Sequence, residues 1–201
     1  MARTPRTKPT STKRGPEDRR DALVGAALAL FSERGFYGTN VPLILERANV
    51  SAGAMYNQFA SKEELVNVLY QRCSALLTAA LWEGFSEVGS FRKQFGELWK
   101  RLSDFASKHP KELGFLESYN HAGYLDKESQ EAERGRWQRL RQFFEGAQAQ
   151  GVVRPAPIEV LLPLLWGGFI GVLRAQLFGQ NPLTPADLLE AERSLWEAIR
   201  A

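Results

Sequence analysis

The sequence predicts an all-α protein of about nine helices, with a small N-terminal helical domain followed by a larger one. Three observations lead to this prediction. Apolar residues recur at helical spacing along most of the 201 residues. No segment alternates between polar and apolar residues as a half-buried strand does. The sequence also lacks a hairpin turn pair and a phosphate-cradling glycine loop.

Residues 1–16 form a basic segment that has no large apolar residue beyond Met1. It cannot bury enough apolar surface to fold alone, so we expect a disordered arm. Residues 1–20 carry seven Lys and Arg against two acids, or +5, so the remaining 181 residues contribute −2 to the net charge of +3. This asymmetry suits contact with nucleic acid at one end. A solvated tail that only aids solubility is an equal alternative.

The first helix is expected from Pro16 to about Arg34. Leu23, Ala27 and Leu30 lie on its core face, and the glycine after Arg34 is a typical helix stop.

The stretch from Thr39 to Lys62 has the pattern of two short helices joined by a tight turn. Asn40 is a good N-cap for the first of them. Asn49 tolerates the left-handed conformation that ends this helix, and Ser51 can cap the next one.

The second short helix is expected to bury Met55 and Phe59 and to expose a small, polar face. Small residues let a helix approach a surface closely, and Asn and Gln side chains can bond base edges bidentately. Lys62 opens the following helix, where an anion would meet its ammonium and free N–H groups. This layout is typical of a DNA-reading helix-turn-helix. The residues expected to contact DNA are Thr39, Asn40, Ser51, Gly53, Ala54, Tyr56, Asn57, Gln58 and Lys62.

The stretch from Phe31 to Leu65, about a sixth of the chain, resembles the DNA-binding region of the TetR family of transcriptional regulators. The matching residues are Phe31, Gly35, Thr39, Val41, Ile44, Ala48, Val50, Ser51, Gly53, Tyr56, Phe59, Ser61, Lys62, Glu63 and Leu65. Asn49 departs from the family, which usually has Gly in this turn. Ala54 is a second departure, because it can read a base only by apolar contact.

A fourth helix begins at Lys62, and it is expected to pass from the first domain into the second. Three aromatic-rich helices should follow. The fifth includes Phe85 and ends near His109, the sixth runs from Lys111 to about Ala122, and the seventh opens in the acidic segment 126–133 and ends near Gln150. The expected domains are a disordered arm over 1–16, a helix-turn-helix domain over 17–65 and a helical ligand-binding and dimerisation domain over 66–201.

Two more helices are expected over Ile158–Phe178 and Pro185–Ile199. The first is apolar on most of its circumference, so it must be covered on several sides. Gly167 and Gly171 lie one turn apart and would let another helix approach closely. The family resemblance implies that these two helices form a four-helix dimer interface with a second copy.

The resemblance also implies a small-molecule effector, which is expected to bind among the aromatic residues of the second domain. His121, Tyr119 and Arg174 are the expected polar contacts, because buried polar groups need partners. For each aromatic residue singly, a place in the core explains its spacing better than a place in a pocket does. The candidate lining residues are Phe95, Trp99, Phe115, Tyr119, His121, Trp137, Phe144, Trp166, Phe169 and Arg174.

Other classes of protein fit the sequence less well. The two histidines and one cysteine, Cys73, give no metal-ligand spacing and no intrachain disulfide, so we expect no metal, no cofactor and no enzyme. Cys73 is expected to be a small buried hydrophobe in a reducing cytoplasm. The longest uncharged apolar run, Val160 to Leu173, spans roughly 21 Å as a helix, short of the ~30 Å of a bilayer core, so no membrane partner is expected.

The sequence therefore predicts a cytoplasmic, homodimeric repressor that binds an inverted-repeat operator in double-stranded DNA. A small apolar or aromatic ligand is expected to release it. An activator, a regulator that responds to a partner protein, and a helical adaptor that binds no DNA remain as alternatives.

Overall fold

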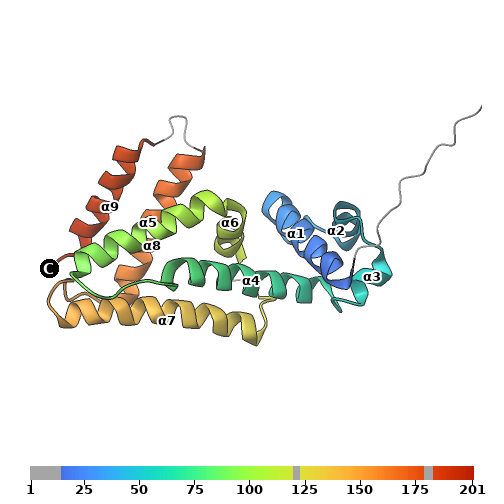
Figure 1. Cartoon of the computed structure of the whole chain (residues 1–201), viewed down its shortest axis with the longest axis horizontal. Helices are drawn as coiled ribbons and strands as arrows, with labels where there is room; N and C mark the ends of the chain where they lie inside the picture. The colour runs from blue at the N-terminus through green and yellow to red at the C-terminus, as the bar shows by residue number, and fades with distance from the viewer. Residues whose placement is uncertain (1–14, 120–122, 179–182) are drawn as a thin grey trace, which may run out of the picture. The chain divides into compact units, whose positions relative to one another are not determined.

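The computed structural model describes residues 15–119, 123–178 and 183–201, and all its regular elements within these ranges are helices (Figure 1). The all-α prediction is confirmed. The helices are α1 (Pro16–Arg34), α2 (Val41–Ala48), α3 (Ala52–Tyr56), α4 (Lys62–Trp82), α5 (Phe91–Lys108), α6 (Pro110–Tyr119), α7 (Lys127–Ala149), α8 (Ile158–Phe178) and α9 (Pro185–Ile199). They form two compact units, Met1–Leu69 and Tyr70–Ala201, and the boundary falls inside α4.

The first unit is built from α1, α2, α3 and the start of α4. The Asn40 side chain accepts a hydrogen bond from the Leu43 N–H (3.0 Å) and caps α2. Asn49 ends α2 in the left-handed conformation, with φ 51° and ψ 54°. The Ser51 hydroxyl accepts from the Ala54 N–H (3.3 Å) and caps α3. Each of these three local predictions is confirmed.

The core of the first unit is apolar and tightly closed. Met55 and Phe59 are 0% and 1% exposed, so both predicted side chains are buried, but only Met55 lies on α3, because this helix ends at Tyr56 and Phe59 follows in the turn. The other buried side chains of this core include Leu23, Ala27, Leu30, Phe31, Ile44, Ala48 and Leu65.

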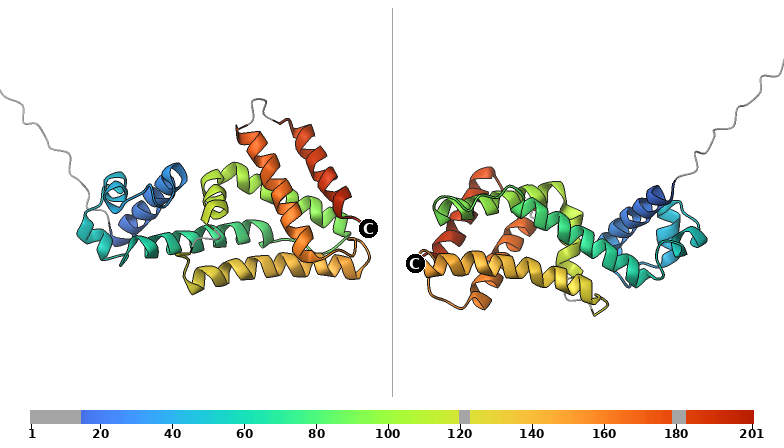
Figure 2. Two further views of the ribbon diagram at one scale, coloured as in Figure 1. Left: turned by 180° about the vertical axis from the view of Figure 1, so that it is seen from behind. Right: turned by 60° about the horizontal axis from the view of Figure 1, so that its bottom comes forward.

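In the second unit, α4 and α7 lie side by side and run in the same direction (Figures 1 and 2). Polar contacts join them along their length. The Gln71 amide donates to the Ser129 hydroxyl (3.2 Å), and the guanidinium of the buried Arg136 donates to the Ser74 hydroxyl (3.3 Å). Further along, the Arg139 guanidinium lies 4.5 Å from the centre of an α4 tryptophan ring.

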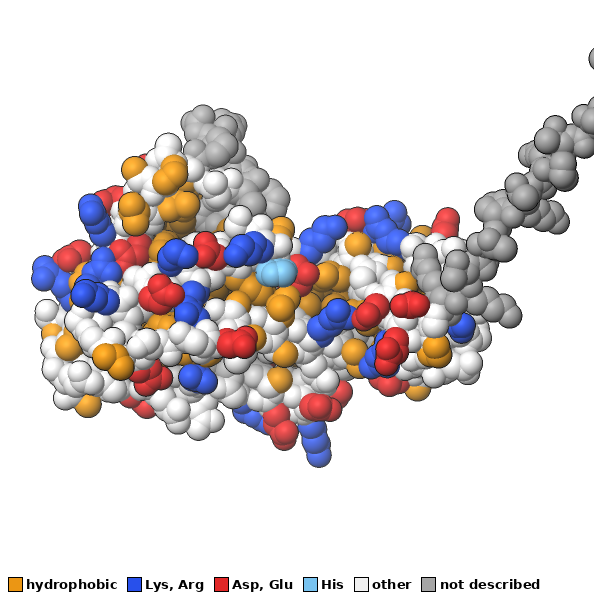
Figure 3. Space-filling view, in the orientation of Figure 1, with side chains coloured by type: hydrophobic (Ala, Val, Ile, Leu, Met, Phe, Trp, Pro, Cys, Tyr) orange, Lys and Arg blue, Asp and Glu red, His pale blue; other side chains and the backbone are white. Residues whose placement is uncertain are grey.

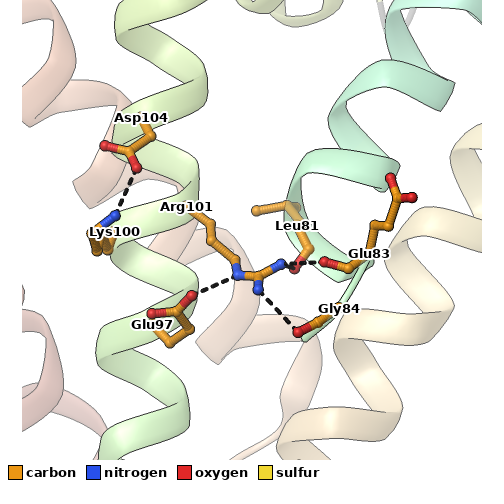
Figure 4. A network of polar contacts seen from close by, with 7 residues as sticks. All are labelled: Leu81, Glu83, Gly84, Glu97, Lys100, Arg101 and Asp104. Carbon is orange, nitrogen blue, oxygen red and sulfur yellow. Dashed lines mark hydrogen bonds and ion pairs between the residues drawn. The ribbon is translucent and has the colours of Figure 1, made fainter. Parts of the chain in front are cut away.

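The C-terminal end of α4 is held by Arg101 of α5 (Figure 4). Its guanidinium donates to the carbonyls of Leu81 (3.3 Å), Glu83 (2.7 Å) and Gly84 (3.2 Å). The Glu97 carboxylate binds the same guanidinium at 2.7 Å. Carbonyls without helical partners and the negative end of the helix dipole favour a cation here. Arg101 therefore caps the C-terminal end of α4 from α5.

The loop between α4 and α5 corrects one sequence prediction. Phe85 was expected in the fifth helix, but it lies in this loop, and α5 begins at Phe91. Gly84 (φ 63°) and Gly89 (φ 104°) adopt conformations that other residues rarely reach, and these break the helical path. Phe85 nevertheless packs edge-on against Phe143 of α7, with ring centres 5.8 Å apart.

Helices α8 and α9 form an antiparallel pair beside α5 (Figure 2). A Cβ atom at Gly168 would lie 2.7 Å from the Leu195 side chain, so the glycine permits this close approach. Arg92 of α5 binds the buried Glu192 of α9 through two hydrogen bonds of 2.5 and 2.7 Å. The segment after α9 is held to the loop between α7 and α8, because the backbone of Val153 forms an antiparallel bridge with Arg200.

Helix α8 is unusually exposed for an apolar helix. The segment Ile158–Gln176 is long and apolar enough to cross a membrane by length and composition, and 28% of it is buried in the single chain. The helix length estimated from the uncharged run Val160 to Leu173 was therefore too short, because the helix extends past both ends of that run. One such helix is weak evidence for a membrane span, since the core helix of a soluble protein passes the same test. Figure 3 shows hydrophobic side chains at the surface over α9, the neighbour of α8.

Candidate nucleic-acid interface and ligand cavity

The exposed face of α3 and of the turn after it carries most of the predicted DNA-contact residues. Tyr56 is 56% exposed, and Gly53 and Asn57 are also exposed. Ala54 and Gln58 are half-buried beside them. Because α3 ends at Tyr56, the last two polar side chains project from a turn rather than from a regular helix. The surface is small and polar, as an element that enters a groove requires.

Arg20 of α1 supports this surface, although no sequence pattern predicted such a role for it. Its guanidinium donates to the Gln58 carbonyl (3.4 Å) and lies 4.7 Å from the centre of the Phe59 ring. These contacts hold the turn after α3 against α1. An arginine on an amphipathic helix gives no sequence signal for such a contact, because its partner lies 38 residues away.

Thr39 and Lys62, two of the predicted DNA contacts, also make hydrogen bonds inside the first unit. The buried Thr39 hydroxyl lies within hydrogen-bonding distance of the carbonyls of Leu30 (3.2 Å) and Gly35 (2.9 Å). The Lys62 ammonium donates to the carbonyls of Phe36 (3.0 Å) and Thr39 (2.9 Å). It also lies 3.7 Å from the centre of the Phe36 ring.

The electrostatics of Lys62 follow from this position. Burial lowers the pKa of the Lys62 ammonium, and the nearby charge of Glu63 partly opposes that shift. A lysine begins from a high pKa, so the group stays charged at neutral pH. Asn40 and Ser51 are exposed residues whose side-chain oxygens cap helices. Contact of all these residues with DNA stays a prediction.

An apolar cavity of about 80 Å³ lies within the second unit. Six of the predicted ligand-contact residues line it: Phe95, Trp99, Trp137, Phe144, Trp166 and Phe169. The other lining residues are leucines, which sequence reasoning missed because a lining leucine and a core leucine have the same spacing. They are Leu81, Leu98, Leu102, Leu140, Leu162, Leu165 and Leu195.

Of the remaining four candidates, the two whose side chains are described do not line this cavity. Phe115 is fully buried against Tyr70, with ring centres 6.5 Å apart. Arg174 is exposed on α8, so the reason for choosing it, burial of a polar group, does not hold. His121 and the side chain of Tyr119 lie outside the described residues.

The aromatic rings around the cavity pack mainly edge to face. Trp99 and Phe169 meet at 5.3 Å and 89°, and Trp137 and Trp166 at 5.8 Å and 76°. The Trp166 indole N–H donates to the Glu117 carboxylate at 2.7 Å, so its polar group already has a partner. The cavity therefore offers apolar surface and ring edges rather than charge.

Among the described residues, no group of three or more His, Cys, Asp and Glu side chains could hold a metal ion. Cys73 is 2% exposed, and burial together with the charge of Glu112 raises the pKa of its thiol to about 12. A thiol with this pKa stays protonated at neutral pH and is a poor nucleophile. The expectation of a small buried hydrophobe agrees with its burial.

The capped helix-turn-helix and its exposed polar face define the class of this protein, a DNA-binding regulator with a separate helical domain. Comparisons with known proteins lead to the family. Residues 23–69 match the family described as bacterial regulatory proteins, tetR family, and residues 70–201 match the tetracyclin repressor-like C-terminal domain. The chain therefore belongs to the TetR family of bacterial transcriptional regulators.

Individual relatives agree with this assignment. An uncharacterized HTH-type transcriptional regulator of Haemophilus influenzae is 26% identical over 91% of this chain and 96% of its own length. The HTH-type transcriptional repressor KstR2 of Mycobacterium tuberculosis is 45% identical over 51 residues, which cover 25% of this chain and 26% of that protein. The crystal structure of a TetR family regulator from Marinobacter aquaeolei is 21% identical and shares the fold, with a TM-score of 0.82 over 92% of this chain and 96% of that one.

Proposed function

We propose that this regulator is a cytoplasmic homodimeric repressor that binds an inverted-repeat operator and is released by a small apolar or aromatic molecule. The observation that carries the proposal is the combination of an exposed polar recognition face with an apolar cavity in the other unit. Family membership supplies the DNA-binding class, and a relative named as a repressor favours repression over activation.

In this proposal the residues of the α3 region divide the work of DNA binding. Asn57 and Gln58 read bases, because amide side chains can pair with base edges in the major groove. Tyr56 and Lys62 hold phosphates, which give affinity without sequence information. Residues 1–14, the part of the basic arm outside the described residues, would add affinity for any duplex.

Dimerisation is assigned to α8 and α9. Val160 and Leu164 of α8 are 49% and 58% exposed, and Leu189 of α9 is 60% exposed. Large apolar side chains exposed on two neighbouring helices favour an interface there. A two-fold dimer would place its recognition elements in successive major grooves, which is why the operator should be an inverted repeat.

Ligand and DNA are proposed to oppose each other through α4. The chain crosses from the first unit to the second within this helix. Its Leu81 lines the cavity, and Arg101 fixes its end to α5, which contributes Phe95 and Trp99 to the same cavity. A ligand that prefers one arrangement of these helices would shift the population of DNA-binding conformers.

Selection of bound duplexes from a random pool tests the proposal. The full chain should enrich an inverted repeat, and binding should weaken steeply as salt rises. Gln58→Ala should relax preference at one base pair by about 1–3 kcal/mol without loss on random DNA. An enriched pool without two-fold symmetry would contradict the dimeric operator.

Release by ligand needs a second measurement on the selected operator. Uncharged aromatic compounds are added, and operator affinity is followed at fixed salt. A fall in affinity supports the sensor function. Turnover of a bound compound would instead indicate an enzyme.

A further inference from the structure

A second cavity adjoins the apolar one and differs from it in chemistry. Its volume is about 250 Å³, and it lies among α5, the start of α6, α8 and α9. Trp99 and Phe169 line both cavities, so their edge-to-face pair is a wall that the two share. The residues that line the second cavity are Trp99, Ser103, Ala106, Ser107, Pro110, Phe169, Val172, Leu173, Gln176 and Leu188.

The second cavity is lined by hydroxyl and carboxamide side chains, which the first lacks. Ser103 and Ser107 of α5 contribute hydroxyls, and Gln176 of α8 contributes an amide. None of the lining residues of either cavity is charged. A carboxylate or ammonium ion placed here would lose its hydration and gain only neutral partners, with no opposite charge, so a charged ligand is disfavoured.

The Gln176 side-chain carbonyl oxygen lacks a hydrogen-bond donor among the described residues. This atom, Oε1, is buried and has no hydrogen-bond partner in the described chain. Buried polar atoms without partners are rare in folded proteins, and each one costs free energy until a donor reaches it. Because Gln176 lines the second cavity and its Oε1 is itself closed off, a rotation of the amide is needed before a ligand O–H or N–H there can supply the missing donor.

We infer that the effector is an uncharged amphipathic molecule with two parts. Its aromatic or hydrocarbon body packs against the Trp99–Phe169 wall in the second cavity, and its hydroxyl or neutral N–H group donates to Gln176 Oε1. This assignment rests on the proposed effector function of the domain and narrows the class of ligand. It also makes Gln176 the residue that distinguishes a donor-bearing ligand from a hydrocarbon of equal size.

Two probes of matched shape test the assignment. 2-Naphthol carries a hydroxyl where 2-methylnaphthalene carries a methyl group. Equilibrium dialysis against the full chain, without DNA, gives both dissociation constants. We expect 2-naphthol to bind about tenfold more tightly in the wild type, since one hydrogen bond to a buried acceptor is worth about that factor.

Variants then locate the hydrogen bond. In Gln176→Leu the two dissociation constants should converge, chiefly by weaker binding of 2-naphthol. Gln176→Met is the second variant if Gln176→Leu loses helicity by circular dichroism. Gln142→Leu is the matched control, because Gln142 lines an outer groove of α7 and neither of the two cavities. It should keep the tenfold preference.

The outcomes separate this inference from the proposed function. Equal binding of the two probes by the wild type, or a preference that survives in Gln176→Leu and Gln176→Met, would overturn the hydrogen bond. Absence of binding by both probes would overturn the ligand class. The expected tenfold preference without any change in operator affinity would support the ligand class and contradict release from DNA.

Discussion

Lys62 has two possible roles that a single substitution can separate. Its ammonium donates to the carbonyls of Phe36 and Thr39, and hydrogen bonds to a charged group stabilise a fold more than neutral ones do. Lys62→Ala should therefore lower the free energy of unfolding of the first unit by about 1–3 kcal/mol. If Lys62 also holds a phosphate, the same variant should reduce the slope of log affinity against log salt concentration by about one.

Thermal unfolding and salt titration of duplex binding give the two quantities independently. Arg47→Ala serves as the stability control, because the Arg47–Glu33 ion pair is exposed and such pairs contribute little. A stability loss with an unchanged salt slope would assign Lys62 to the fold alone. An unchanged stability would contradict the importance of its two carbonyl contacts.

The buried thiol of Cys73 predicts a pH dependence of stability. Its folded pKa is raised to about 12 from an ordinary value of 9.0, so the folded state holds the proton where the unfolded state releases it. The stability that the neutral thiol contributes is complete below pH 9 and is lost as pH rises from 9 toward 12. Raising the pH from 9 to 10 should cost the wild type about 1 kcal/mol more than Cys73→Ala.

Urea unfolding of both proteins at the two pH values measures this difference. Lysines and tyrosines also titrate in this range, but they are common to both proteins and cancel. Equal slopes would show that the thiol is accessible to water in the folded state.

At the scale of elements, two glycines of α8 should respond differently to the same substitution. A Cβ at Gly168 would meet Leu195 of α9 at 2.7 Å, whereas a Cβ at Gly171 meets nothing within 4 Å in the single chain. Gly168→Leu should therefore destabilise the folded chain, by about 1–3 kcal/mol for overpacking. Gly171→Leu should leave the chain folded and weaken the dimer, because its new side chain extends toward the proposed partner.

Sedimentation and thermal unfolding of the two variants distinguish these effects. The dimer placement on α8 and α9 would fail if Gly171→Leu remained a full dimer whose contacts map to α5 or α6.

At the scale of the whole molecule, the proposed sensor requires that ligand and operator weaken each other by the same factor. A coupling of about 1–3 kcal/mol is typical of such systems. Arg101→Met removes the donors that hold the end of α4 to α5, so it should reduce this coupling while ligand binding persists. Trp99→Ala, which alters the cavity itself, should abolish the response by weakening the ligand.

The measurement is operator affinity with and without a releasing compound in each protein. Lys100→Met is the control for Arg101→Met. Lys100 is one residue away on α5 and pairs with Asp104 (2.8 Å) at the surface (Figure 4). Undiminished coupling in Arg101→Met would exclude the α4 cap from the transmission of ligand binding.

The sequence by itself determined the elements of this protein and its DNA-binding motif. Helical periodicity, the caps Asn40 and Ser51 and the left-handed Asn49 act over a few residues, so their signals are local. The aromatic candidates of the cavity were partly predictable because six of them share apolar helical faces that meet.

Only the tertiary structure decided which side chains meet across distant elements. The Lys62 ammonium contacts carbonyls 23 and 26 residues away, and Arg101 caps a helix that ends about 20 residues earlier. The tertiary structure also decided that Gly168, rather than Gly167 or Gly171, lets α8 and α9 pack closely within the chain. These contacts depend on how helices pack together in three dimensions, and the spacing of residues along one helix carries no record of its partner.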